Sequence, residues 1–353
     1  VPAWRGEPDP HAGYHSQRTS PGNSPLPAMQ SALHPALRAV GPLFLAAAAG
    51  CSSGGGAGPP APDPQQAKLQ LGLRLMFDED LSRPAGISCG TCHDPLLGWT
   101  DGRPQGKGIQ DNTLDTAGHD GALAVAGARW KTLLMSRNTP TVYNSFLFPN
   151  LFWDGRAGDL AHQANFPIEG SVEMNSDWTT HVIPLLEADA EYQSLFSLAF
   201  GDANITQERA VDALGAYEAT IAVFDTPFDE FLAGDATALD AAELRGHDLF
   251  FGAAGCSACH AAPLLTDFDF HNTGVPTVGV VALDGGVDLG RGQFMDLSPM
   301  PGAPGLPVDE PTDYAKFKTP QLRMVAVTGP YMHNGALLTL EEVVEFYDQG
   351  GGP

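Results

Sequence analysis

Two short patterns in the sequence place a histidine directly after a pair of cysteines, and this combination has a specific chemistry. The pattern is Cys-x-x-Cys-His, and its two copies are Cys89, Cys92 and His93, and Cys256, Cys259 and His260. Two thiols three positions apart can form thioethers with both vinyl groups of one haem, and the adjacent His then lies under the iron as its proximal ligand. A redox dithiol or half of a zinc site is the alternative for one copy taken alone. Because no third Cys pair is present to complete a zinc tetrahedron, the two copies together favour two covalently bound c-type haems.

An internal repeat precedes both motifs. Leu71–Phe77 and Arg245–Phe251 match at a glycine, a leucine and a phenylalanine, and each stretch ends an amphipathic helical pattern. A turn and then a Cys-x-x-Cys-His motif follow each of them. The shared order of helix, loop and motif indicates two copies of one structural unit.

The fifth cysteine, Cys51, follows a segment typical of exported proteins. Arg38 precedes an apolar run, Val40–Ala49, which is too short to span a bilayer as a stable helix and has the proportions of a signal peptide. We therefore expect a signal peptide over residues 29–50 and a periplasmic product. The small residues before Cys51 resemble a bacterial lipoprotein cleavage box, which predicts a lipid anchor on Cys51. An ordinary cleaved signal that leaves Cys51 unused is the alternative.

Composition divides the rest of the chain. Residues 1–28 show no apolar period and are expected to be a disordered or misread leader, while residues 51–66 form a tether rich in Gly, Pro and Ser. The two motifs then predict an N-terminal domain over residues 67–225 and a C-terminal domain over residues 226–353.

The chain is strongly acidic, with 18 Lys and Arg against 42 Asp and Glu and a formal net charge of −24. Nucleic acids and anionic membranes bind basic protein faces, because basic side chains release the counterions of the phosphates. The charge therefore argues against nucleic acid as a partner and leaves contact with a membrane only through the predicted anchor at Cys51.

The segments around both motifs resemble the bacterial di-haem cytochrome c peroxidase family, which includes MauG. The matching stretches are ISCGTCHDPLLGWTDG (87–102), RNTPTVYN (137–144), LFWDGRAGDLAHQ (151–163), FPIEGSVEMN (166–175), GCSACH (255–260) and FKTPQLRMVAVTGPYMHNGALLTLEEVVEFYDQGG (317–351). The resemblance implies an all-α fold of two cytochrome c-like domains, each carrying one covalently bound haem. It also implies that the N-terminal haem reacts with peroxide, that the C-terminal haem handles electrons, and that a calcium ion lies between them.

The resemblance assigns roles to four residues of the first domain. Glu173, in the segment SVEMN, matches the catalytic glutamate, whose carboxyl group moves a proton from the inner to the outer oxygen of peroxide. Gln163 and Pro167 match residues that line the same pocket, and Trp153 matches a tryptophan that relays electrons between the haems. Each has an ordinary alternative when taken alone: a solvated Glu, a helix cap, a turn and a core Trp.

The resemblance also implies a calcium site. Asn138, by its side-chain oxygen, and Thr328 and Pro330, by their backbone carbonyls, match the family's calcium ligands. These are hard oxygen donors of the kind that calcium prefers, with waters filling the remaining positions.

The distal ligands of the two haems are the most informative positions. Tyr347 matches the sixth ligand of the second haem in MauG, and Met332 is the rival ligand. A phenolate favours higher oxidation states of iron, whereas a thioether favours the ferrous state. Many family peroxidases close the first haem with a His on the loop after the first motif. Here that loop, residues 103–136, holds His119, for which a surface turn is the alternative.

Three functions are consistent with these residues. The first is a peroxidase that reduces hydrogen peroxide to water with electrons from a small periplasmic cytochrome or copper protein, passed from the C-terminal to the N-terminal haem. The second is a MauG-type enzyme that oxidises aromatic residues of a partner protein through a shared high-valent di-haem state. The third is a plain electron carrier, which Glu173 argues against because a carrier gains nothing from a proton shuttle. A homodimer is an expected assembly, and a truncated C-terminus is expected because family chains continue into a further helical segment.

Overall fold

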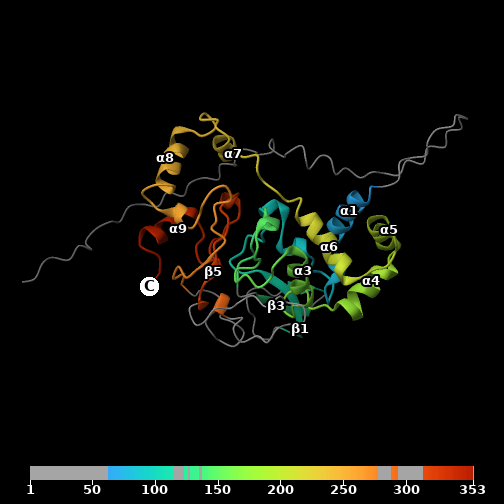
Figure 1. Cartoon of the computed structure of the whole chain (residues 1–353). Coiled ribbons are helices and arrows are strands. Elements are labelled where there is room, and N and C mark those ends of the chain that lie inside the picture. The colour runs from blue at the N-terminus through green and yellow to red at the C-terminus, as the bar shows by residue number, and fades with distance from the viewer. Residues whose placement is uncertain are drawn as a thin grey trace, which may run out of the picture. The chain divides into compact units, whose positions relative to one another are not determined.

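The structure is a computed structural model, and it describes residues 63–114, 123–125, 128–134, 137–276, 288–292 and 313–352 (Figure 1). These residues belong to one compact unit, Pro60–Pro353. Its helices are α1 (Pro64–Met76), α2 (Cys89–Cys92), α3 (Leu160–Glu169), α4 (Ile183–Ala188), α5 (Ala190–Phe200), α6 (Gln207–Glu218), α7 (Pro227–Leu232), α8 (Ala241–Phe250) and α9 (Leu340–Asp348).

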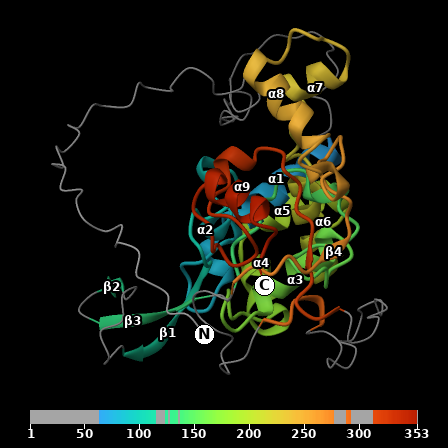
Figure 2. The ribbon, with the colours of Figure 1, turned by 90° about the vertical axis from the view of Figure 1, so that its left-hand side faces the viewer.

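The described strands are few and short. β1 (Lys107–Leu114), β3 (Ala128–Leu134) and β2 (Leu123–Val125) form an antiparallel sheet in that order (Figure 2). β4 (Phe270–His271) pairs with β5 (Phe317–Lys318). The first sheet lies within the segment that the sequence predicted as a loop after the first motif. None of the described helices has both the length and the apolar character needed to cross a bilayer.

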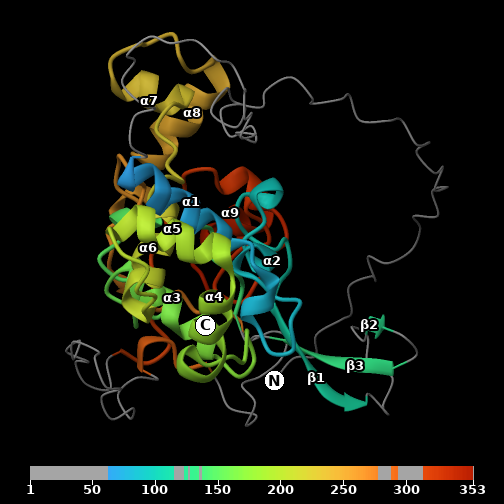
Figure 3. The same cartoon turned by 90° about the vertical axis from the view of Figure 1, so that its right-hand side faces the viewer.

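The main hydrophobic core forms where α1 packs against α5 and α6 (Figure 3). Leu71 and Leu75 lie one turn apart on α1, and both are fully buried. Gly72 lies at the crossing with α6, where a Cβ atom would collide with the backbone carbonyl of Ala213. The glycine of the sequence repeat therefore lets the two helices approach closely.

The C-terminal helices are packed differently. α7, α8 and α9 contain no buried residue, and among the described residues from 226 onward Leu264 is the one Leu, Ile, Val, Met, Phe, Tyr or Trp residue that is buried. Gly246, the repeat counterpart of Gly72, has open space where its side chain would be. This half of the molecule thus contributes almost no apolar core of its own.

The internal repeat extends well beyond the two motifs. Three pairs of residues with left-handed backbone conformation are each separated by 180 positions: Asn144 and Met324 (φ 54° and 59°), Phe152 and Met332 (64° and 71°), and Gly155 and Gly335 (75° and 66°). Isolated antiparallel bridges repeat with the same offset, Leu151 with Ala157 and Tyr331 with Leu337. Residues 137–169 and 317–349 are therefore two copies of one loop-and-helix unit, which ends in α3 in the first copy and in α9 in the second.

Candidate functional site

The first Cys-x-x-Cys-His motif forms the short helix α2 and the residue that ends it. Nδ1 of His93 lies 3.1 Å from the carbonyl oxygen of Trp99. Burial lowers the pKa of His93, so the ring is neutral. Because a carbonyl only accepts, Nδ1 must carry the ring proton, and the lone pair of Nε2 remains for a metal.

The second motif repeats this arrangement. Nδ1 of His260 lies 2.8 Å from the carbonyl oxygen of Leu265, and burial lowers the pKa of His260 as well. Trp99 and Leu265, which present the two carbonyls, share a left-handed backbone with φ of 62° and 59°. The local fold thus fixes the same ring tautomer twice, which is the tautomer that a haem iron requires at Nε2.

The thiols and the apolar surface also fit haem attachment. None of the four motif cysteines is in a disulfide. The helices before and after the second motif, and the turn that leads into α9, leave large apolar side chains exposed, which a porphyrin face would cover: Leu232, Leu249, Leu338, Val344 and Tyr347. The donor sets and this surface together fit one c-type haem at each motif.

Replacing both Cys256 and Cys259 by Ala is therefore expected to remove one haem per chain and to unfold the C-terminal half. The reason is that this half buries so few of its own side chains. Mass spectrometry would count the haems, and hydrogen exchange would report protection of α7, α8 and α9. The matched variant, with Cys89 and Cys92 replaced, should also lose one haem but keep protection in α5 and α6. Unchanged protection of α8 in the first variant would contradict the prediction.

Glu173 lies beside the first motif. Its charge acts on both Cys89 and Cys92, and its carboxylate folds back over Gly170, directly after α3. The side chain is half-buried, and burial raises its pKa, an effect that the positive charge of Arg156 opposes. A carboxyl group with this environment exchanges protons closer to neutral pH than a solvated one does.

Gln163 and Pro167 lie one turn apart on α3, just before the loop that carries Glu173. One segment therefore carries all three residues predicted for the peroxide pocket. In the 180-residue repeat, Pro167 is the counterpart of Tyr347 on α9. The same helical position thus carries a side chain with no donor atom in the first unit and a phenol in the second.

Tyr347 lies beside the second motif. The charges of Cys259 and Cys256 act on its hydroxyl group, which also bonds to Thr273, and burial raises its pKa. The rival ligand, Met332, shapes a turn in which its carbonyl accepts from the Gly335 amide. Among the described contacts, none joins Met332 to the second motif.

Sequence reasoning missed a buried carboxyl group close to the first motif. Glu218, at the end of α6, is 7% exposed, and burial raises its pKa to about 8. Its charge acts on Cys89 from the side of the α1 and α6 core. A single acidic residue on an otherwise apolar helix face was the available signal.

Trp153 lies in a seam between the two repeat units, which we define by Asn138, Trp153, Lys318 and His333. The indole Nε1 of Trp153 donates to the carbonyl of Asn138 over 2.8 Å. The backbone amide of Asn138 donates to the backbone carbonyl of His333. In the same way, the backbone amide of Lys318 donates to the backbone carbonyl of Trp153, and both distances are 2.7 Å. Lys318 and His333 are the repeat counterparts of Asn138 and Trp153, so the two contacts are reciprocal, as in an interface with a two-fold axis.

A buried ion-pair network lies against the seam. Arg137 donates to the carboxylates of Asp154 and Asp288, which keep the pKa of its guanidinium high despite burial. The Phe317 ring stacks on the imidazole of His333 with centroids 3.5 Å apart, and burial lowers the pKa of His333 to about 4. The ring of His333 is therefore neutral at physiological pH.

Asn138, Thr328 and Pro330, the three residues matched to calcium ligands, are each described by the structure. The side-chain amide of Asn138, which is 5% exposed, donates to the carbonyl of Arg103 over 2.7 Å, so its oxygen is left to accept. Thr328 packs against Gly98 in the loop of the first motif, and Pro330 is buried. No described contact joins the three residues, and the calcium site stays a prediction. His119 and Cys51 lie outside the described residues.

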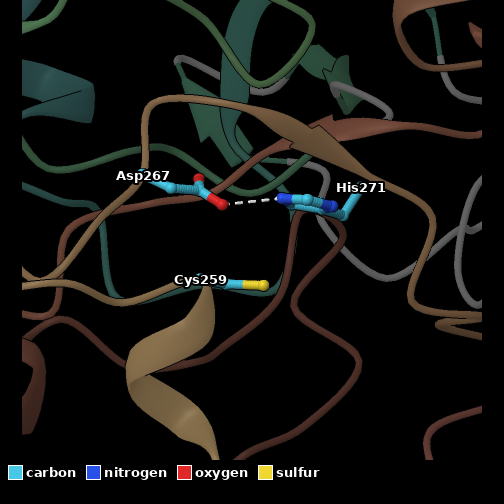
Figure 4. Close-up of side chains that lie close together, drawn as sticks. All are labelled: Cys259, Asp267 and His271. Carbon is cyan, nitrogen blue, oxygen red and sulfur yellow. Dashed lines mark hydrogen bonds and ion pairs between the residues drawn. The ribbon is translucent and has the colours of Figure 1, made fainter.

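The Cys259, Asp267 and His271 side chains approach one another within 4.8 Å (Figure 4). Nε2 of His271 lies 2.8 Å from a carboxylate oxygen of Asp267. Once the Cys259 sulfur is in a thioether it can no longer act as a thiolate ligand, so this group is better described as a polar pair flanking the attachment point of the second haem.

Comparison with known proteins identifies the family. The family model for di-haem cytochrome c peroxidase matches residues 66–237. The chain is 38% identical to the methylamine utilization protein MauG of Methylorubrum extorquens over 285 residues, which cover 80% of this chain and 69% of that protein. It is 33% identical to the cytochrome c551 peroxidase of Nitrosomonas europaea, covering 80% of this chain and 73% of that protein.

Solved structures agree with this result. A MauG-like protein associated with microbial copper homeostasis has a TM-score of 0.63 and 30% identity, covering 81% of this chain and 77% of that one. The di-haem peroxidase BthA from Burkholderia thailandensis has a TM-score of 0.61 and 26% identity, covering 79% of this chain and 71% of that one. The predicted all-α fold with two cytochrome c-like units and two c-type haems is thereby confirmed. The chain belongs to the di-haem cytochrome c peroxidase and MauG family of oxidoreductases.

Proposed function

We propose that the protein is a peroxidase that reduces hydrogen peroxide to water at its first haem, with electrons passed from the second. The observation that carries this proposal is the position of Glu173, a half-buried carboxyl group with a raised pKa beside Cys89 and Cys92. When bound, the haem supplies the iron at which the O–O bond is cleaved and the electrons that cleavage consumes.

Glu173 moves the proton that this reaction needs. Its carboxylate accepts the proton of the inner oxygen of peroxide and returns it to the outer oxygen, so that water leaves rather than hydroxide. Arg156 keeps a fraction of the carboxyl ionised against the effect of burial, which leaves Glu173 able to start the transfer as a base.

Pro167 and Tyr347 support a division of labour between the haems. Pro167 offers no donor atom on the helix that follows the first motif, so the first distal side stays open to peroxide. Tyr347 offers its phenol at the equivalent place beside Cys256 and Cys259, which supports ligation of the second haem. A site that binds peroxide and a site that only handles electrons are then built from two copies of one unit.

A MauG-type activity, in which aromatic residues of a partner protein are oxidised, is the second candidate function. Tyr347 favours it, because an anionic phenolate stabilises oxidised iron and lets oxidising equivalents be held. In a MauG-type enzyme the reductant is the partner protein. In a peroxidase it is a small periplasmic cytochrome or copper protein. We also propose that the protein is exported to the periplasm, that Cys51 carries a lipid anchor, and that the chain forms a homodimer. The boundary between the two domains is proposed to lie between residues 225 and 226.

Peroxide added to the as-isolated ferric protein, before any reductant, tests the proposal and separates the two functions. Optical and EPR spectra should show a high-spin haem at rest and immediate consumption of peroxide. A long-lived oxidised state that decays only when a protein substrate is supplied would favour the MauG-type activity, whereas rapid reduction by a small cytochrome would favour the peroxidase. Consumption that begins only after half-reduction would contradict an open first haem. No consumption in either state would leave the plain electron carrier.

A further inference from the structure

The reciprocal seam allows one half of the molecule to be mapped onto the other. The backbone amide of Asn138 bonds to the carbonyl of His333, and the backbone amide of Lys318 bonds to the carbonyl of Trp153 over the same distance. The two donors are 180 positions apart in the sequence, and so are the two acceptors. The guanidinium of Arg137 lies 5.4 Å from the ring of Phe317, its own counterpart, as expected for two residues near a two-fold axis. A site on one side of this axis should therefore have a counterpart on the other.

The predicted calcium ligands have counterparts that the structure brings together. Asn138, Thr328 and Pro330 map onto Lys318, Phe148 and Asn150 under the 180-residue offset. The Lys318 Nζ donates to the carbonyl oxygen of Asn150 over 3.0 Å and lies 4.3 Å from the centre of the Phe148 ring. Of the three positions that the family resemblance assigns to a metal in one half, one carries an ammonium group in the other half, and the other two contact it.

We propose that Lys318 is a built-in cation, which occupies the pseudo-symmetric counterpart of the calcium site and holds the second side of the seam. The inference rests on the proposed calcium site at Asn138. On the first side, the neutral oxygen of Asn138 leaves room for an exchangeable ion. On the second side, the Lys318 side chain carries the charge itself.

The surroundings of Lys318 favour a cation. The Asn150 carbonyl oxygen accepts from the ammonium, and the electron-rich face of the Phe148 ring attracts a positive charge. Burial lowers the pKa of Lys318 to about 7, and the negative charge of Asp154, which is 1% exposed, opposes that effect and favours the charged form. A calcium ion takes six to eight oxygen ligands, part of them from water, whereas an ammonium with three donors needs fewer acceptors and brings its own charge.

Calcium stoichiometry of the protein with both haems attached tests the proposal. We expect the wild type to bind one Ca²⁺ per chain, measured by titration calorimetry after treatment with a chelator. Lys318→Asn restores the residue type of the first side, and because the other two ligands are backbone carbonyls, it should bind two. Lys316→Asn is the matched control, since the side chain of Lys316 pairs with Asp313 and not with Asn150 or Phe148, and it should bind one. A Lys318→Asn protein that binds one Ca²⁺ would overturn the proposal, as would a wild type that binds none.

Thermal unfolding provides a second measurement if Lys318→Asn yields too little protein. Lys318→Met keeps the length of the side chain but removes the charge, and should lower Tm by about 2–8 °C with or without Ca²⁺. Lys318→Arg should retain most of the wild-type Tm. Equal Tm values for Lys318→Met and the wild type would contradict a built-in cation. Neither measurement involves peroxide, so a failure here is distinct from a failure of the proposed peroxidase activity.

Discussion

Replacing Glu173 by Gln is expected to slow cleavage of peroxide by a factor of about 10²–10⁴ while both haems stay attached. The amide has nearly the shape of the carboxyl group, so it keeps the packing over Gly170. It cannot take a proton from peroxide, however. The loss therefore measures the proton transfer itself. Single-turnover kinetics with excess peroxide, followed by absorbance of the haems, would give the rate.

The pH dependence separates this role from a structural one. Burial raises the pKa of Glu173, so the ionised form that accepts the proton is depleted at a higher pH than for a solvated carboxyl group. The wild-type rate should fall as the pH drops through that raised pKa, and Glu173→Gln should lose this limb of the profile. Glu169→Gln, an exposed position at the end of α3, is the matched control and should keep both rate and profile. A Glu173→Gln enzyme with an unchanged rate would assign the proton transfer to another group, and the buried carboxyl of Glu218, whose charge acts on Cys89, is a candidate for it.

The haem motifs were predictable from the sequence because their chemistry is local. Two thiols and an imidazole within five positions reach one porphyrin whatever the rest of the chain does. The helix before each motif was equally visible, since Leu71 and Leu75 recur at the helical period. The structure confirms a helix before each motif, α1 before the first and α8 before the second.

The seam was not predictable in the same way, because its contacts join residues that lie far apart in the sequence. Trp153 and Lys318 meet through backbone groups, which leave no residue-type signature. The 180-residue repeat that relates them is carried mainly by left-handed backbone angles at Asn144 and Met324, two positions whose side chains have nothing in common. Only the fold shows that His333 is the counterpart of Trp153.

The repeat gives a structural basis to the proposed asymmetry between the two haems. In the sequence, Pro167 and Tyr347 belong to unrelated motifs. In the fold they occupy the same position of two equivalent helices, α3 and α9. The two matches can therefore be compared directly, and the comparison supports an open first haem and a ligated second haem. We therefore propose that the difference in ligation between the two haems depends on Pro167 and Tyr347.

Replacing Tyr347 by His is expected to abolish the long-lived oxidised state that follows peroxide addition, while both haems remain attached. Imidazole is a neutral donor and stabilises oxidised iron less than an anionic phenolate does. The hydrogen bond of Tyr347 to Thr273 would be lost as well, which removes an interaction that favours the ionised phenol. Stopped-flow absorbance should show the oxidised state decaying within the mixing experiment instead of persisting, and potentiometry should show a changed midpoint for the second haem alone.

The controls decide between Tyr347 and its rival. Tyr314→His changes an exposed tyrosine of the same half and should leave the lifetime unchanged. Met332→Leu removes the only other candidate ligand that the sequence offered, and the second haem should keep its spectrum because Met332 shapes a turn. If Met332→Leu alters that spectrum and Tyr347→His does not, the sixth ligand is a thioether. The second haem would then be tuned to deliver electrons rather than to hold an oxidising equivalent, and the MauG-type activity would lose its physical basis.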